Sequence, residues 1–101
     1  PATIEAFVEL YCEGRVPPDR MRDLVRTIPE VVEAYTVTGE SDGILRVRAS
    51  DTGHFEKVLG LIRNHPGVTR TRSALVLSRL DQAALAAEAA GFHAAERQFY
   101  T

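Results

Sequence analysis

The chain has 101 residues, 45% of them hydrophobic, so it is long enough for one compact domain and too short for two ordinary ones. Twelve Lys and Arg against fourteen Asp and Glu give a formal net charge of -2, which leaves no basic excess for binding a polyanion. We therefore expect no direct nucleic-acid contact by this chain alone.

Cysteine content and hydropathy limit the cellular compartments that suit the chain. Cys12 is the single cysteine, which excludes an intramolecular disulfide and a Cys-rich zinc site. The sequence has neither a run of about eighteen apolar residues nor the basic-then-apolar start of a signal peptide. We expect a cytoplasmic protein that makes no membrane contact.

The first two predicted elements are a strand and a helix. Apolar residues alternate from Thr3 to Cys12, which predicts a strand with one buried face. A helix is predicted to begin near Pro18 or Asp19 and to stop at Pro29. Its apolar positions recur at helical spacing, at Met21, Leu24, Val25 and Ile28.

A hairpin and a second helix come next. Strands are predicted from Val31 to Thr38 and from Ile44 to Ala49, joined by the turn-forming residues 39–43. Asp51 or Thr52 is a suitable cap for the second helix. Its apolar stripe comprises Phe55, Val58, Leu59 and Ile62.

The last predicted strand runs from Val68 to Ser78, after a turn that Gly67 permits. The resulting order, β-α-β-β-α-β, is that of ferredoxin-like α+β domains, in which two helices cover one face of an antiparallel sheet. We expect residues 1–80 to form this domain and residues 81–101 to form a C-terminal helical tail. Aromatic residues near its end either dock on a partner or belong to a frayed terminus, namely Phe92, Phe99 and Tyr100.

The second face of the predicted sheet carries more apolar groups than a solvated face needs. Phe7 and Tyr11 lie on the reverse side of the first strand, and residues 74–77 are continuously apolar. A sheet with one face in water should alternate more cleanly. We therefore expect this face to be buried against a second copy, in a homodimer of the dimeric α/β-barrel type.

The residues that could carry catalysis or bind metal are scattered. His54, His65 and His93 share no spacing that would converge on a metal ion. No local base approaches Cys12, which favours a buried structural thiol over a nucleophile. We predict no catalytic residue, no metal site and no cofactor.

Two other classes of protein share the same order of strands and helices, but this sequence fits both of them poorly. Residues 14–16 are similar to the phosphate-binding loop of acylphosphatases, but Pro17 and Pro18 follow and have no backbone N–H to offer an anion. An RNA-recognition module needs aromatic stacking residues on its central strands, and the predicted strand from Ile44 to Ala49 has none.

Two segments carry more information. Residues 35–42 run from a strand into an acidic turn that contains Gly39; alternatively, this is a solvated hairpin in which Gly39 and Gly43 adopt positive φ. In the last strand, Thr71 and Ser73 are two positions apart and share a face. Hydroxyl residues also simply suit a half-exposed strand.

Together these segments resemble the effector-binding (RAM) domain of the Lrp/AsnC family of transcription regulators. The resemblance runs from about Thr3 to Leu80 and is most specific in residues 29–42 and 66–77. It implies dimers that join through their sheets, further assembly into octamers, and free amino acids bound in clefts between dimers. The effector-binding residues that it implies here are Thr38, Gly39, Glu40 and Asp42, with Thr71 and Ser73 as weaker candidates.

The chemistry of these residues suits an amino-acid effector. Asp42 can accept hydrogen bonds from an ammonium group, and backbone N–H groups around Gly39 can donate to a carboxylate. No helix-turn-helix precedes the first strand, so the chain is either a fragment or a stand-alone sensing domain. A small dimeric α/β-barrel enzyme, such as a monooxygenase or isomerase, and a purely oligomerising module remain as alternatives.

Overall fold

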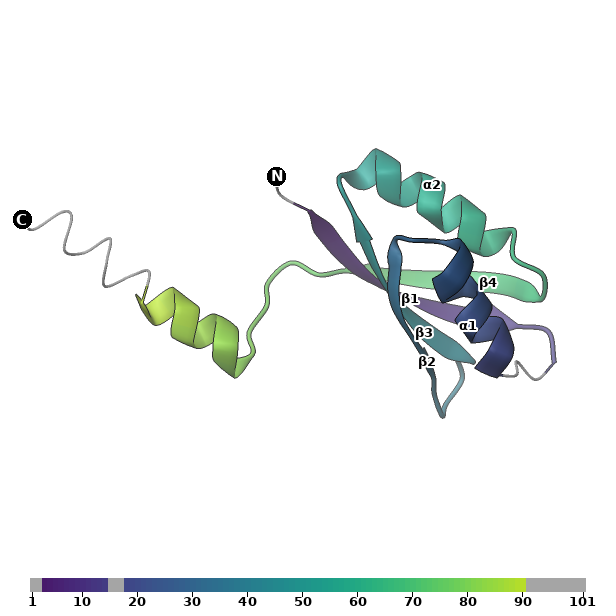
Figure 1. Cartoon of the computed structure of the whole chain (residues 1–101). Coiled ribbons are helices and arrows are strands. Elements are labelled where there is room, and N and C mark those ends of the chain that lie inside the picture. The colour runs from purple at the N-terminus through teal and green to yellow at the C-terminus, as the bar shows by residue number, and fades with distance from the viewer. Residues whose placement is uncertain (1–2, 15–17, 91–101) are drawn as a thin grey trace, which may run out of the picture.

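The computed structural model describes residues 3–14 and 18–90. The elements follow in the order β1 (Ile4–Cys12), α1 (Pro18–Thr27), β2 (Val31–Thr36), β3 (Gly43–Ala49), α2 (Thr52–Arg63) and β4 (Val68–Leu75) (Figure 1). The predicted β-α-β-β-α-β order is thus confirmed.

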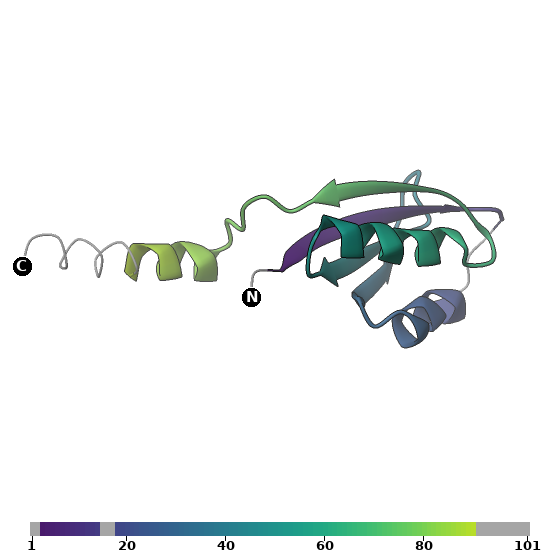
Figure 2. The ribbon, with the colours of Figure 1, turned by 90° about the horizontal axis from the view of Figure 1, so that it is seen from above.

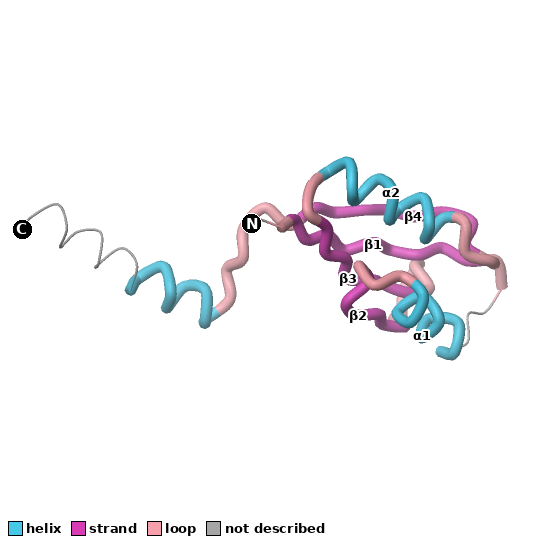
Figure 3. The backbone as a smooth tube through the Cα atoms, turned by 45° about the horizontal axis from the view of Figure 1, so that its top comes forward, coloured by secondary structure: helices cyan, strands magenta, loops and turns pink. Residues whose placement is uncertain are grey.

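The four strands form one sheet in the order β2-β3-β1-β4, and every neighbouring pair is antiparallel (Figure 3). Both helices lie on the same side of this sheet (Figure 2). Ala6, Val8 and Leu10 of β1 are fully buried beneath them, as the alternation in the sequence predicts. The rest of the core comes from both helices, β2 and β3, and includes Met21, Leu24, Ile28, Val31, Leu45, Val47, Val58 and Ile62.

Local chemistry sets the ends of the helices. Ile28 donates its backbone N–H to Leu24 at 3.0 Å, and Pro29 cannot continue the helix, so α1 ends at Thr27. At the start of α2, Oδ1 of the cap residue Asp51 accepts the backbone N–H of His54 at 2.7 Å. None of the helices in the described ranges is long and apolar enough to cross a lipid bilayer.

Two predicted strands are too long. β2 ends at Thr36 and not at Thr38, and β4 ends at Leu75 and not at Ser78. Val76 still donates its N–H to the carbonyl of Glu5 at 2.8 Å, but β1 begins at Ile4 and supplies almost no partner beyond that point. Leu77 is 94% exposed in the single chain.

Residues 82–90 form a further helix that extends away from the sheet (Figure 1). Asp81 caps it, because Oδ1 of Asp81 accepts the N–H of Ala84 at 2.7 Å. The tail aromatics Phe92, Phe99 and Tyr100 lie outside the described residues. The division of the chain at residue 80 remains a prediction.

Candidate functional site

The turn between β2 and β3 contains four of the six candidate residues. Gly39 has a φ of +114°, a backbone conformation that L side chains rarely adopt, so glycine is needed there. Thr38, Gly39 and Asp42 line an open hollow of about 390 Å³ beside the start of α1. Glu40 belongs to the same turn and is exposed, but it does not line this hollow.

Asp42 fixes the turn to the end of β1. Its Oδ2 accepts the backbone N–H of Cys12 at 2.7 Å, and its own N–H donates to the carbonyl of Leu10 at 2.8 Å. No described residue donates to Oδ1 of Asp42. The carboxylate therefore holds the loop in place, and its second oxygen accepts no hydrogen bond from residues 3–14 and 18–90. Nothing in the sequence indicated the contact with Cys12, because the two residues are 30 positions apart.

Gly43 is a packing glycine, and the expectation of a positive φ there is wrong. It lies in β3, and its φ is not positive. A Cβ atom at Gly43 would collide with the side chain of Met21 and lie 3.1 Å from the carbonyl oxygen of Tyr35. A larger residue would force the end of the Met21 side chain to move and would press on the Tyr35 carbonyl, so glycine suits the close approach of α1 to the sheet.

Thr71 and Ser73 lie on β4, on the side of the sheet that the helices cover. They pair with Leu10 and Val8 of β1, both buried on that side. Oγ1 of Thr71 accepts a hydrogen bond of 3.1 Å from Nε of Arg63 at the end of α2. Arg63 was not predicted as a site residue, because its closeness to β4 depends on how α2 lies across the sheet.

One chain does not bring the six candidate residues into one pocket. Leu10 pairs with Gly43 on one side and with Thr71 on the other, so two strand spacings, about 10 Å, separate β4 from the start of β3. Thr71 lines its own hollow of about 270 Å³ with Arg63 and residues 68–70. A free amino acid cannot bridge the two hollows within one chain.

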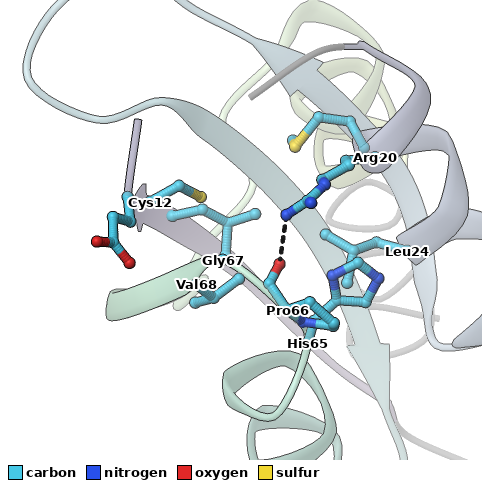
Figure 4. A pocket seen from close by; sticks show the side chains of 10 residues that line it. Cys12, Arg20, Leu24, His65, Pro66, Gly67 and Val68 are labelled. Carbon is cyan, nitrogen blue, oxygen red and sulfur yellow. Dashed lines mark hydrogen bonds between the residues drawn. The ribbon is translucent and has the colours of Figure 1, made fainter. Parts of the chain in front are cut away.

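A more enclosed hollow lies between β1, α1 and the turn before β4 (Figure 4). Arg20 crosses it and donates from Nη1 to the carbonyl of Pro66 at 3.1 Å. Gly67 has a φ of +91°, and a Cβ there would lie 2.7 Å from the same nitrogen. The volume of about 20 Å³ suits about one water molecule and excludes an amino acid.

The groups considered for metal binding or catalysis lie apart. Nε2 of His54 is 2.7 Å from Glu30, whereas Nε2 of His65 is 3.8 Å from Asp23. Within residues 3–14 and 18–90, no three His, Cys, Asp or Glu side chains are arranged to hold a metal ion. His93 and most of the loop at 14–16 lie outside the described residues.

Cys12 is only half-buried, whereas the sequence predicted a buried thiol. Burial raises the pKa of its thiol, the charge of Asp42 raises it further, and Arg20 has a smaller opposing effect. A raised pKa leaves little thiolate at neutral pH, so the side chain is a poor nucleophile.

The face of the sheet opposite the helices combines aromatic and charged side chains. Phe7 and Tyr35 are 40% and 47% exposed. Glutamates and arginines surround them, including the ion pairs Glu5–Arg48 at 2.9 Å and Glu33–Arg46 at 3.0 Å. This open face is less apolar than the sequence pattern indicated. It does present both charge signs and large aromatic groups, which self-association can use.

Comparison with known sequences identifies the domain type. Residues 5–85 match the family model described as the Lrp/AsnC ligand binding domain. The HTH-type transcriptional regulator Rv2324 of Mycobacterium tuberculosis is 50% identical over 76 residues, which are 75% of this chain and 51% of that protein. Homocitrate synthase of Sulfurisphaera tokodaii is 30% identical over 80 residues, 79% of this chain but 17% of the enzyme. The chain thus spans about half of the first relative and a small part of the second.

Solved structures of related proteins have the same fold as this chain. FFRP-DM1 superposes with a TM-score of 0.66 at 27% identity, and the match covers 73% of this chain and 99% of that one. The transcriptional regulator NMB0573 of Neisseria meningitidis, solved in complex with L-Met, gives a TM-score of 0.68 at 27% identity over 78% of this chain and 53% of that one.

Proposed function

The chain belongs to the Lrp/AsnC ligand-binding domain family, and we propose that it is a non-catalytic sensing domain that couples binding of a free amino acid to assembly of its own copies. The single observation that carries the proposal is the turn at residues 37–42, in which a left-handed glycine precedes an anchored carboxylate. A cytoplasmic setting fits this role.

The turn offers both kinds of group that an amino acid requires. Oδ1 of Asp42, to which no described residue donates, accepts from the ammonium group, and backbone N–H groups around Gly39 donate to the carboxylate. Such charge-assisted bonds contribute more where water is excluded. The hollow is open in one chain, so the proposal assigns the exclusion of water to a neighbouring copy.

The separation of the candidate residues also supports a site that is completed by assembly. Thr71 and Ser73 lie away from the turn in the same chain, but a neighbouring copy can bring its own β4 to the turn. We propose a homodimer that joins through the open face, with dimers associating further toward an octamer. Amino-acid binding at the junction would then stabilise the assembled form.

The relatives support amino-acid sensing but do not show which process the sensing domain regulates. L-Met is present in the complex of the neisserial regulator. The same domain type matches part of a transcriptional regulator and part of a homocitrate synthase, so its role is separable from any one partner domain. With a net charge of -2, this chain alone should bind no DNA operator at physiological salt.

A thermal-shift screen of the twenty amino acids against the assembled protein tests the proposal, because a ligand that binds only the native state raises its melting temperature. We expect a small set of related amino acids to raise the melting temperature and to shift the oligomer distribution in light scattering. If no amino acid changes either quantity in a correctly assembled oligomer, only a purely oligomerising module remains.

A further inference from the structure

A serine, a histidine and a carboxylate are hydrogen-bonded in series where β3 ends and α2 begins. Oγ of Ser50 is 3.0 Å from Nδ1 of His54, and Nε2 of the same ring is 2.7 Å from Oε2 of Glu30. Glu30 comes from the loop between α1 and β2, 24 positions before His54. We propose that Ser50 is a nucleophile that takes an acyl group from small, neutral, activated esters, with His54 as its general base.

The hydrogen bonds determine which ring nitrogen faces the serine. The backbone N–H of Ser50 donates to Nδ1 at 3.0 Å, so Nδ1 carries no proton. Nε2 is then protonated and donates to Glu30. Nδ1 can therefore take the proton of Oγ, and Glu30 stabilises the imidazolium that forms. A nucleophile, a base within hydrogen-bond reach and a third group that orients the base make up the arrangement that activates serine in unrelated folds.

Neighbouring backbone groups hold this arrangement in place. Arg48 donates its N–H to the carbonyl of Glu30 at 2.9 Å, which ties the loop to the end of β3. Asp51 accepts the N–H of His54 at 2.7 Å, which fixes the first turn of α2. Glu30 and His54 are half-buried, whereas Ser50 is exposed. The base is thus partly shielded, and the nucleophile is open to a reagent from solution.

The start of α2 favours the charge that develops during acyl transfer. The first two N–H groups of the helix, those of Thr52 and Gly53, donate to no described residue. Together with the helix dipole, they favour a negative charge beside Ser50, such as that on the carbonyl oxygen of an ester under attack.

Charge and shape indicate the class of donor. The carboxylates of Glu30 and Asp51 flank Ser50, so they disfavour an anionic donor such as an acyl phosphate and leave a neutral ester unaffected. The adjoining hollow, which His54 and Gly53 help to line, is open and offers no enclosing wall to a long chain. The acyl group that we assign is therefore small.

The reaction is an acyl transfer to the protein. Oγ of Ser50 bonds to the carbonyl carbon of the ester while its proton moves to Nδ1 of His54. The bond from that carbon to the leaving oxygen then breaks, and the proton passes from Nδ1 to this oxygen. The products are acyl-Ser50 and an alcohol or phenol. Acyl-serine is an alkyl ester and less reactive than an activated aryl ester, so the acyl group accumulates and the modification is stoichiometric.

The test uses the full chain and p-nitrophenyl acetate. A burst of p-nitrophenol should accompany acetylation, and peptide mass spectrometry should place the acetyl group on Ser50. Ser78 is an internal control, because it is exposed and bonds to no described histidine. Ser50 should react about a hundredfold faster than Ser78, as expected for general-base assistance. Acetyl phosphate, the anionic donor, should give a smaller preference for Ser50 over Ser78.

Substitutions separate the nucleophile from the base. Ser50→Ala should abolish the burst. His54→Gln can still form hydrogen bonds but cannot take up a proton, so acetylation of Ser50 should slow about a hundredfold. Lys57→Arg removes the amine one turn further along α2, keeps its charge and should leave acetylation of Ser50 unchanged. Circular dichroism checks that each variant folds.

Glu30 is a positioning residue, so its test also measures the state of the ring. Glu30→Gln should slow acetylation of Ser50. Heteronuclear NMR of the imidazole at mildly alkaline pH should show the proton of His54 on Nε2 in the wild type and a weaker preference for that nitrogen in Glu30→Gln. A loss of stability alone would leave this preference unchanged.

Three outcomes would overturn the proposal. They are the absence of an ester on Ser50, equal rates at Ser50 and Ser78, and unchanged acetylation of Ser50 in a folded His54→Gln variant. Each would mean that the three groups only cap α2 and join it to the loop before β2.

Discussion

The backbone N–H of Cys12 donates a hydrogen bond of 2.7 Å to Oδ2 of Asp42, 30 positions later in the chain. This contact gives Asp42 two separate tasks in the proposed site. One oxygen holds the turn against the end of β1, and the other, which accepts from none of the residues that the structure describes, is the one that the proposal assigns to a ligand. Substitutions that remove the charge and substitutions that remove the acceptor should therefore have different effects.

Asp42→Asn keeps an oxygen that can accept from Cys12 but removes the negative charge. We expect the affinity for the effector amino acid to fall by about 2 to 5 kcal/mol, because a charged partner is lost in a desolvated site. This is roughly thirtyfold or more in affinity. Calorimetric titration of the amino acid found by screening measures it, with Glu40→Gln as the control of smaller effect because Glu40 does not line the hollow.

Asp42→Ala should in addition destabilise the fold, by about 1 to 3 kcal/mol, because the N–H of Cys12 loses its acceptor. Urea unfolding of both variants separates the two tasks. Unchanged effector binding in Asp42→Asn would remove Asp42 from the site and leave it only the structural role.

Phe7 is the sharpest probe of the proposed dimer. It is 40% exposed on the open face, between Arg46 of β3 and Ala74 of β4 in the strand register. Phe7→Lys should dissociate the dimer, because a charge without a partner would be buried between two sheets. Light scattering at micromolar concentration measures the mass, and Phe7→Leu should stay dimeric. A monomeric wild-type chain, or a Phe7→Lys variant of unchanged mass, would contradict the sheet-to-sheet arrangement.

The sequence predicted the fold well wherever periodicity and capping act within one element. The alternation in β1, the stop at Pro29 and the cap at Asp51 all depend on neighbours a few positions away. The apolar run 74–77 misled the prediction, since pairing with β1 places Ala74 on the open face and Leu75 on the helix side, and leaves Leu77 without a partner strand. Apolar character alone cannot show where the partner strand ends.

The candidate site was predicted less completely, for a related reason. The resemblance to the Lrp/AsnC effector domain pointed to the acidic turn. The bond from Cys12 to Asp42 and the bond from Arg63 to Thr71 join different elements and become visible only when the sheet is assembled. Gly43 shows the same limit. The residues around Gly43 indicate a turn, whereas in the folded chain the space for a side chain at Gly43 is taken by Met21 of α1.

Gly43→Ala should therefore destabilise the protein by about 1 to 3 kcal/mol, because the added methyl group overpacks the contact with Met21. Gly60→Ala is a matched control, since a Cβ at this position of α2 meets nothing within 4 Å. It should stabilise the protein by about 0.5 to 1 kcal/mol, as expected for glycine in a helix interior. Chemical denaturation of both variants gives the comparison, and equal effects would refute the packing role of Gly43.

Acid should weaken the contact between His54 and Glu30, which joins the start of α2 to the loop before β2. The side-chain hydrogen bond from His54 Nε2, at 2.7 Å, is the main cause that lowers the pKa of Glu30 below its usual 4.5, and a backbone hydrogen bond adds to it. Nδ1 of the same ring accepts the N–H of Ser50 at 3.0 Å, so Nε2 carries the proton that it donates.

A carboxyl group with a lowered pKa in the folded state stabilises that state while it is ionised. The contribution is therefore fully present above the unfolded value of 4.5 and is lost as the pH falls through the lower folded value. The difference in unfolding free energy between wild type and Glu30→Gln should be present at pH about 5 and shrink at more acid pH. Urea denaturation across this range measures it, with Glu56→Gln on the exposed side of α2 as the control. A difference that stays constant below the pKa of Glu30, or that grows in acid, would show that ionised Glu30 does not stabilise this end of the sheet.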